Sequence, residues 1–168
     1  MILDESGSDL KQARDYARAE GGTRAKAPKP HCPGKKFSII GVISIFAITA
    51  MMYIESAING SIFFTFVKEL LLPKLGPGKY LIMDNINFHK NSAVIELIES
   101  TGTKVVYLPP YSPDLSPIEK MWSKIKTILK SIRPRTESEF HDALFHAANE
   151  VDQDDLQAWF EDCGYKTA

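Results

Sequence analysis

The stretch KYLIMDNINFHKNSAVIELIESTGTKVVYL, residues 79–108, places one helical pattern between two strand patterns. Its first five residues form a short apolar run that stops at Asp84. Residues 91–100 then carry apolar side chains at helical spacing up to Gly102, and residues 104–108 form a second apolar run. Strands that alternate with helices along the chain are typical of α/β proteins. This stretch therefore predicts a strand, a helix and a strand of an α/β domain.

The residues on both sides extend the same pattern. The run Phe37–Ile54 has no charged residue and is rich in β-branched and aromatic side chains. It predicts two buried strands joined by a tight turn, at about 37–46 and 49–55. Helices are expected at 9–19, after a cap at Asn59, and from Ser116 to about Ile132. Two further helices are expected in the acidic segments 136–150 and 152–162. We therefore predict an α/β fold with a mixed sheet flanked by helices.

Composition sets limits on the class of protein. Of the 168 residues, 44% are hydrophobic and 24% are charged, so the chain can bury the core of one domain. Cys32 and Cys163 lack the spacing of a disulfide framework or a zinc site. The run Phe37–Ile54 just reaches the length of a membrane span, but Ser, Thr and Gly interrupt it, so we prefer buried strands and expect no membrane. The sequence does not open with a secretory signal pattern, and a cytoplasmic location is expected.

The net charge of −1 conceals an uneven distribution. Residues 115–135 hold six Lys or Arg against one acidic residue, whereas residues 136–168 hold one against nine. A basic stretch of this density indicates a surface that contacts phosphates. A solvated helix face is the alternative interpretation.

Three acidic residues stand where α/β proteins place functional groups. Asp4 follows the stub of a strand and Asp84 follows the strand at 79–83, and ligands bind beyond the carboxyl ends of such strands. Each of these acids taken singly is also explained as a turn former or a helix cap. Glu119 completes a capping box with Ser116, which accounts for it without any function. The proline-rich connector 109–115 would also hold Glu119 in a fixed place, as a functional residue requires.

Three motifs together resemble the catalytic domain of DDE transposases of the mariner-like superfamily, as found in bacterial insertion sequences. The motifs are LDESG at 3–7, MDN at 83–85 followed by His89, and LPPYSPDLSPIEKMW at 108–122. Thirty-four residues separate Asp84 from Glu119, which is the interval characteristic of that group. The resemblance extends from Asp4 to about Phe145 and implies a ribonuclease-H-like fold.

The resemblance also implies an activity and its cofactors. Asp4, Asp84 and Glu119 would bind two Mg²⁺ ions, with Mn²⁺ as a substitute, for cleavage and strand transfer of DNA in transposition. The partner would be double-stranded DNA, both transposon ends and a target TA dinucleotide. The implied organisation is a catalytic domain at 1–150, with a truncated first strand and a loop-rich insertion at 5–36, and an acidic helical tail at 151–168.

The sequence departs from the family in two places. Ser116 replaces the usual Asn, and both residues cap helices well. The family's N-terminal helix-turn-helix region is missing before Asp4, which predicts a second-frame product or a truncated copy. A homodimer or a partner that supplies the helix-turn-helix is then expected, at the nucleoid of a bacterium. The alternatives are a catalytically silent remnant that only binds DNA or full-length transposase, and a ribonuclease-H-like nuclease that cuts without joining.

Further residues are assigned from the helix pattern and from the resemblance. On a helix from Ile118, Lys126, Lys130 and Arg133 share the flank of Glu119, so we predict that they bind the DNA backbone. Lys120 and Lys124 lie on the other flank and are expected to be solvated. His89 is expected to contact the scissile phosphate or to orient a carboxylate, with a plain polar contact at a helix start as the alternative. Trp122 is expected in the core, and Tyr111 is expected to pack against the prolines or to stack on a base.

Overall fold

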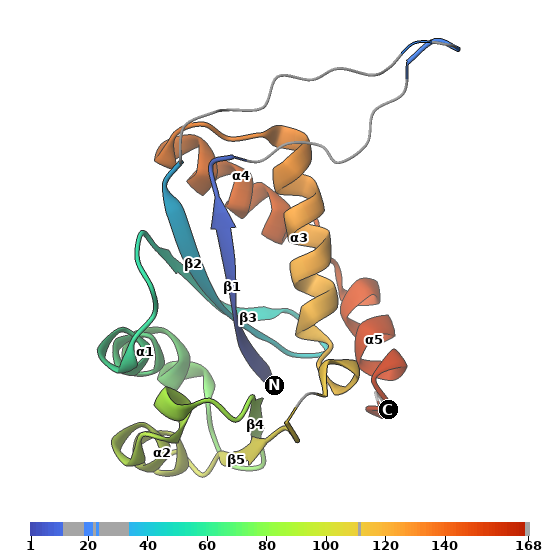
Figure 1. The fold of residues 1–168 in the computed structure, drawn as a ribbon. Helices are drawn as coiled ribbons and strands as arrows, with labels where there is room; N and C mark the ends of the chain where they lie inside the picture. The colour runs from blue at the N-terminus through green and yellow to red at the C-terminus, as the bar shows by residue number, and fades with distance from the viewer. Residues whose placement is uncertain (12–18, 22, 24–33, 111, 167–168) are drawn as a thin grey trace.

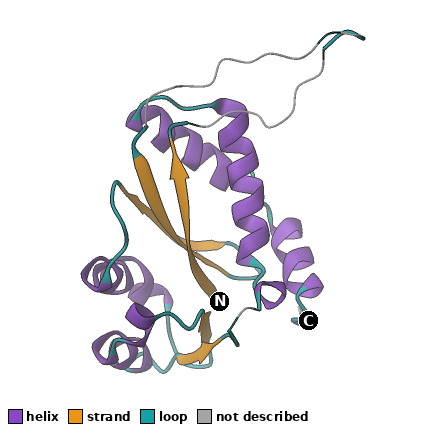
Figure 2. Cartoon of the chain, viewed as in Figure 1, coloured by secondary structure: helices purple, strands orange, loops and turns teal. Residues whose placement is uncertain are grey.

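A computed structural model describes residues 1–11, 19–21, 23, 34–110 and 112–166 of the chain. Its centre is a five-stranded sheet with helices on both faces (Figures 1 and 2). The strands are β1 (Ile2–Asp9), β2 (Lys36–Ile43), β3 (Ile48–Ile54), β4 (Tyr80–Met83) and β5 (Lys104–Tyr107). The α-helices are α1 (Gly60–Phe66), α2 (Ser92–Glu99), α3 (Ile118–Ile132), α4 (Glu137–Asn149) and α5 (Gln153–Asp162). Short helical turns lie at Val67–Leu71, Leu72–Lys74, Asn87–Lys90 and Pro113–Leu115.

The sheet is mixed, as the sequence predicts. Its strand order is β3-β2-β1-β4-β5. β1 and β2 pair antiparallel, as do β2 and β3, whereas β4 is parallel to both β1 and β5. The two parallel pairs are reached through helical crossovers, which parallel strands require. β1 is thus the strand at which the antiparallel hairpins meet the parallel half of the sheet.

The core has two layers, one on each face of the sheet. α3, α4 and α5 cover the face that contains Ile2, and their buried residues include Trp122 and Phe140. α1 and α2 cover the opposite face, which contains Leu3. Successive side chains of a strand point to opposite faces, so neighbouring residues of β1 belong to different layers.

The strand and helix predictions are largely confirmed. The uncharged run Phe37–Ile54 forms β2 and β3 with a turn between them, and in the part of the chain that is described no helix is long and apolar enough to cross a membrane. Asn59 caps α1 as predicted, by accepting hydrogen bonds from the backbone N–H groups of residues 61 and 62. Of the predicted helix at 9–19, residues 12–18 lie outside the described residues.

The first strand is longer than predicted. Residues 5–9, which we expected in the loop-rich insertion at 5–36, continue β1 and pair with β2 as far as Asp9 and Lys36. Their composition, Glu-Ser-Gly-Ser-Asp, has low strand propensity. Pairing with the strongly apolar β2 outweighs this local preference, because an antiparallel partner supplies the backbone hydrogen bonds. Asp4 therefore lies within a strand and not at its end.

Candidate active site at the end of strand β4

The register of β1 and β4 brings Asp4 beside Asp84. Leu3 pairs with Met83, the last residue of β4, in the parallel ladder. The next residue of β1 is Asp4 and the next residue after β4 is Asp84, so both acids follow the last paired position. β1 continues past this point whereas β4 ends, which leaves open space next to Asp4.

Glu119 reaches the same place from the first turn of α3. The predicted capping box is wrong, because α3 begins at Ile118 with Pro117 at the N-cap position and without a side-chain cap. The backbone N–H of Glu119 instead donates to the carbonyl of Ser116, at 3.2 Å. A short helical turn, Pro113–Leu115, takes up the residues before Ser116 and shifts the start of α3. The capping explanation for Glu119 is thereby removed.

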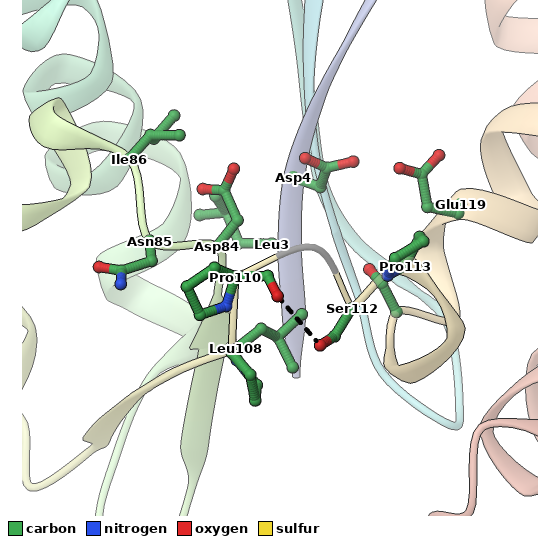
Figure 3. Close-up of a pocket in the computed structure, with 12 residues that line it drawn as sticks. Leu3, Asp4, Asp84, Asn85, Ile86, Leu108, Pro110, Ser112, Pro113 and Glu119 are labelled. Atoms are coloured by element: carbon green, nitrogen blue, oxygen red, sulfur yellow. Dashed lines mark hydrogen bonds between the residues drawn. The ribbon is translucent and has the colours of Figure 1, made fainter.

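The three acids line a single cavity of about 450 Å³ (Figure 3). Asp4 comes from β1, Asp84 from the end of β4, and Glu119 from α3. Figure 3 shows the carboxylate of Asp4 between those of Asp84 and Glu119. The remaining wall is formed mainly by the proline-rich connector, with Leu108, Pro109, Pro110, Ser112 and Pro113. Tyr111, within this connector, lies outside the described residues.

Asp4 is held by a tryptophan that the sequence assigned only to the core. Trp122 is buried, as predicted, and its indole Nε1–H donates to Oδ2 of Asp4 at 3.0 Å. The indole lies against β2 at Gly41, the residue paired with Asp4. A Cβ at position 41 would be 2.6 Å from the indole Cη2 atom. A glycine at this position therefore permits the approach by which Trp122 reaches Asp4.

The electrostatic environment of Asp4 is unfavourable to its charge. Burial first, and then the negative charges of Glu5 and Glu119, raise the pKa of the Asp4 carboxyl to about 7. Hydrogen bonds from the Glu5 backbone and from Trp122 act in the opposite direction but do not cancel the burial. The cavity thus concentrates negative charge that the surrounding protein compensates only in part.

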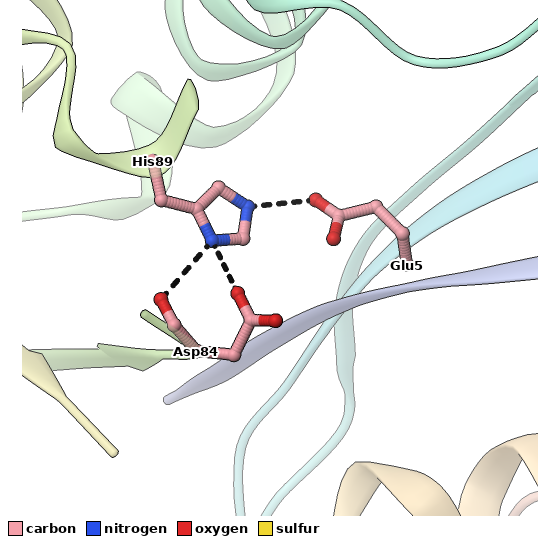
Figure 4. A group of neighbouring side chains, drawn as sticks. All are labelled: Glu5, Asp84 and His89. Carbon is pink, nitrogen blue, oxygen red and sulfur yellow. Dashed lines mark hydrogen bonds and ion pairs between the residues drawn. The ribbon is translucent and has the colours of Figure 1, made fainter. Parts of the chain in front are cut away.

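His89, for which we expected a contact with the scissile phosphate or with a carboxylate, contacts two carboxylates in this structure. Its side chain is fully buried, and its two ring nitrogens lie 2.8 Å from Oε1 of Glu5 and 2.7 Å from Oδ1 of Asp84 (Figure 4). Burial lowers the pKa of His89, but the hydrogen bonds to Asp84 and Glu5 outweigh it and raise the pKa to about 9. Both ring nitrogens are thus in contact with carboxylates, as the carboxylate-orienting role and the plain polar contact would each require.

The basic residues of α3 differ in their surroundings. Lys120 and Lys124, which we expected to be solvated, form ion pairs with Asp162 and Asp155 of the acidic segment. Lys126 is half-buried and forms no such pair with any residue that the structure describes. The sequence predicted that the basic residues divide between two flanks of the helix. It did not predict the acidic partners of Lys120 and Lys124.

The sheet order and the helices on both faces are those of a ribonuclease-H-like domain. A sequence model described as "DDE superfamily endonuclease" matches residues 1–141. The chain therefore belongs to the DDE superfamily endonucleases. A search of curated protein sequences finds no match.

Solved structures of the Mos1 transposase have the same fold. The Mos1 paired-end complex with the left transposon end matches with a TM-score of 0.77 and 16% identity, over 98% of this chain and 55% of the Mos1 chain. The catalytic domain of Mos1 mariner transposase matches with a TM-score of 0.71 and 14% identity, over 96% and 76% of the two chains. A Mos1 mariner paired-end complex with Mn matches with a TM-score of 0.77 and 17% identity, over 96% and 51%. The chain thus spans about half the length of the longer Mos1 chains that it matches.

Proposed function

We propose that this chain is the catalytic domain of a transposase, which cleaves DNA and transfers the cut strand with the help of divalent cations. One observation carries the proposal: Asp4, Asp84 and Glu119, far apart in the sequence, line the same cavity. The Mos1 structures that share the fold include complexes with a transposon end and with Mn, which supports the same chemistry for this chain. A nuclease on the same fold is less favoured, because the YSPDLSPIEK motif resembles transposases.

The residues present fit a site for Mg²⁺ or Mn²⁺. Both ions prefer hard oxygen ligands, and Mg²⁺ keeps several waters, so three carboxylates are sufficient for a pair of ions. The raised pKa of Asp4 reflects burial and repulsion by neighbouring acids, and a bound cation would relieve both. Glu119 is exposed and forms no side-chain hydrogen bond within the described residues, so its carboxylate is available as a ligand.

The chemistry then divides between the cations and the protein. When bound, divalent cations activate the attacking oxygen and stabilise the leaving oxygen of a phosphoryl transfer. Trp122 orients Asp4 by its hydrogen bond, and His89 orients Asp84. The prolines on the wall of the cavity fix the connector that leads to Glu119. The attacking group would be water in cleavage and a DNA 3′-hydroxyl in strand transfer.

A substitution at Glu119 tests this assignment. Glu119→Gln preserves size and removes the charge that a metal site requires. In a fusion of this chain to a helix-turn-helix domain with a known site, the parent should cut DNA next to that site in Mg²⁺, and the Glu119→Gln variant should lose the cut. Glu55→Gln removes an equal charge from an exposed ion pair with Lys35 and should leave cleavage unchanged. A Glu119→Gln fusion that cut at the parent rate would show that Glu119 is dispensable.

We propose further that Lys126, Lys130 and Arg133 hold the DNA backbone beside Glu119. Lys126 and Lys130 share the flank of α3 that carries Glu119, and Arg133 follows as the C-cap residue in the left-handed conformation, whereas Lys120 and Lys124 are paired with acids of α5. Phosphate contacts set affinity and salt dependence rather than sequence choice. Replacing Lys126 and Lys130 with Ala should weaken DNA binding and reduce the salt slope by roughly two contacts. Equal losses from the Lys120 and Lys124 pair would contradict this arrangement.

The chain would act with further parts of a transposition complex. We propose that it pairs as a homodimer or binds a partner that supplies the helix-turn-helix, and that TA dinucleotides are its target, at the nucleoid of a bacterial cell. A silent remnant that only binds DNA is the second candidate. A fusion that binds element ends but cuts none of them in either Mg²⁺ or Mn²⁺ would favour the remnant.

A further inference from the structure

The ring of His89 connects two carboxylates that come from different strands. Nε2 lies 2.8 Å from Oε1 of Glu5 in β1, and Nδ1 lies 2.7 Å from Oδ1 of Asp84 after β4 (Figure 4). The two ring nitrogens point in different directions, so that each faces a different carboxylate. In this structure the cluster of Glu5, His89 and Asp84 forms an ion-paired bridge.

The protein holds this ring firmly from its other sides. The Phe63 ring of α1 lies with its centroid 4.6 Å from that of His89. The hydroxyl of Tyr107 in β5 donates to the backbone carbonyl of His89 at 3.1 Å. The side chain of His89 has no exposed surface, whereas those of Glu5 and Asp84 are 16% and 43% exposed. The buried ring of His89 is thus held in place, and it contacts Asp84, which is the more exposed of its two acidic partners.

We propose that Glu5 is a positioning residue for the candidate metal site and acts on Asp84 through His89. This inference rests on the proposed function, because it needs Asp84 as a metal ligand. Asp4 and Glu5 are neighbours in β1 and point to opposite faces of the sheet. Asp4 faces the cavity and Trp122, while Glu5 faces His89. One strand therefore supplies a candidate ligand on one face and the anchor for a second ligand on the other.

The effect of the bridge on Asp84 follows from its geometry. Asp84 stands at the end of a strand, where its carboxylate would be free to rotate. The contact of Oδ1 with His89 fixes that rotation and leaves Oδ2 for a cation. Groups that orient metal ligands in this way commonly change metal affinity by about 10- to 100-fold when they are removed.

The length of Glu5 is part of the inference. The contact with Nε2 spans the distance between β1 and the turn Asn87–Lys90. Aspartate would be shorter by about 1.5 Å and would lose the contact. Glutamine has the same reach and can either donate or accept a hydrogen bond, so it can bond Nε2 in any protonation state of the ring.

The test measures Mn²⁺ binding to the metal-free chain by electron paramagnetic resonance, with thermal melting as a check of folding. Glu5→Ala and Glu5→Asp should each weaken Mn²⁺ binding by roughly 10-fold, and Glu5→Gln should stay within about threefold of the parent. Glu55→Ala, at an exposed glutamate paired with Lys35, is the matched control and should not change the affinity. Parent-like affinity in folded Glu5→Ala, or equal losses in the Ala and Gln variants, would overturn the inference.

A second set of variants tests the route through His89. If Glu5 acts through His89, adding Glu5→Ala to folded His89→Asn should cause no further loss of Mn²⁺ affinity. Independent, additive losses of Mn²⁺ affinity would overturn that route. If His89→Asn does not fold, the comparison of Glu5→Ala, Glu5→Asp and Glu5→Gln still decides the inference. Asp84→Asn separates this inference from the proposed function. If Asp84→Asn loses Mn²⁺ and Glu5→Ala does not, the positioning role fails and the function stands, whereas unchanged Mn²⁺ binding in Asp84→Asn contradicts the function itself.

Discussion

Asp4→Asn is expected to make the metal-free protein more stable at neutral and alkaline pH. Burial, together with the negative charges of the neighbouring Glu5 and Glu119, raises the pKa of Asp4 from 3.8 to about 7. The folded state therefore binds the proton of Asp4 more tightly than the unfolded state does. The stability that this proton contributes is complete below pH 3.8 and is lost progressively as the pH rises through about 7. Asparagine keeps the shape of the side chain and has no charge to bury.

The magnitude follows from the size of the shift. One pKa unit corresponds to about 1.4 kcal/mol, so a shift of this size sets an upper limit of about 4 kcal/mol at pH 8. Asparagine also weakens the hydrogen bond from Trp122, because a neutral acceptor replaces a carboxylate, and this loss is about 1 kcal/mol. We therefore expect a gain on the order of 2–4 kcal/mol in unfolding free energy at pH 8, and almost no gain near pH 4.

Urea unfolding in the presence of EDTA, at intervals from pH 4 to pH 9, measures this gain. Asp142→Asn removes an equal charge from an exposed position of α4 and should show no such pH dependence. Excess Mn²⁺ should stabilise the parent more than the Asp4→Asn variant, because the variant lacks one candidate ligand. An Asp4→Asn variant that is no more stable than the parent at pH 8, or whose gain is the same at every pH, would refute the electrostatic account of the cavity.

Other predictions follow from the same surroundings. Trp122→Phe keeps the buried ring but removes the N–H that donates to Asp4, so NMR titration should show a higher pKa for that carboxyl. Gly41→Ala would place a Cβ 2.6 Å from the indole, and urea unfolding should show a loss of about 1–3 kcal/mol. Gly7→Ala, in the same sheet but with open space at its Cβ, is the control and should change stability by less than about 1 kcal/mol. The pKa of His89 is raised from 6.5 to about 9, so its contribution to stability is complete below pH 6.5 and is lost as the pH rises through about 9. His89→Asn should therefore flatten the fall of unfolding free energy over that interval, measured in EDTA.

Much of the fold could be predicted from the sequence because its elements have clear local signals. The run Phe37–Ile54, which predicted the two strands, is uncharged and β-branched, and the helices carry apolar stripes between good caps and breakers. β1 beyond Asp4 could not be predicted in this way, since residues 5–9 are polar and their strand depends on pairing with β2. The capping box at Ser116 failed for a related reason. A local motif competes with the turn Pro113–Leu115, whose geometry depends on the proline-rich connector.

The candidate acids could be found from motifs, but their supporting residues could not. Asp4, Asp84 and Glu119 lie in recognisable stretches of sequence, whereas the hydrogen bond of Trp122 to Asp4 joins residues 118 positions apart. Trp122 also lies in the apolar stripe of α3, which explains it fully as a core residue. Glu5 was adjacent to a predicted ligand and gave no signal of its own. The alternation of side chains along β1 was the available clue, because it sends Glu5 to the face opposite Asp4.

The distribution of charge on α3 resolves an apparent conflict between the cavity and the DNA substrate that we propose. DNA is an anion, and a cavity lined by three carboxylates repels it. The positive charges of Lys120 and Lys124 are compensated by Asp162 and Asp155 on one flank of the helix. The other flank, which carries Glu119, has Lys126, with no acidic partner among the described residues. Under the proposed function, Lys126 would meet the DNA backbone on the flank of Glu119, and the three carboxylates would hold the cations.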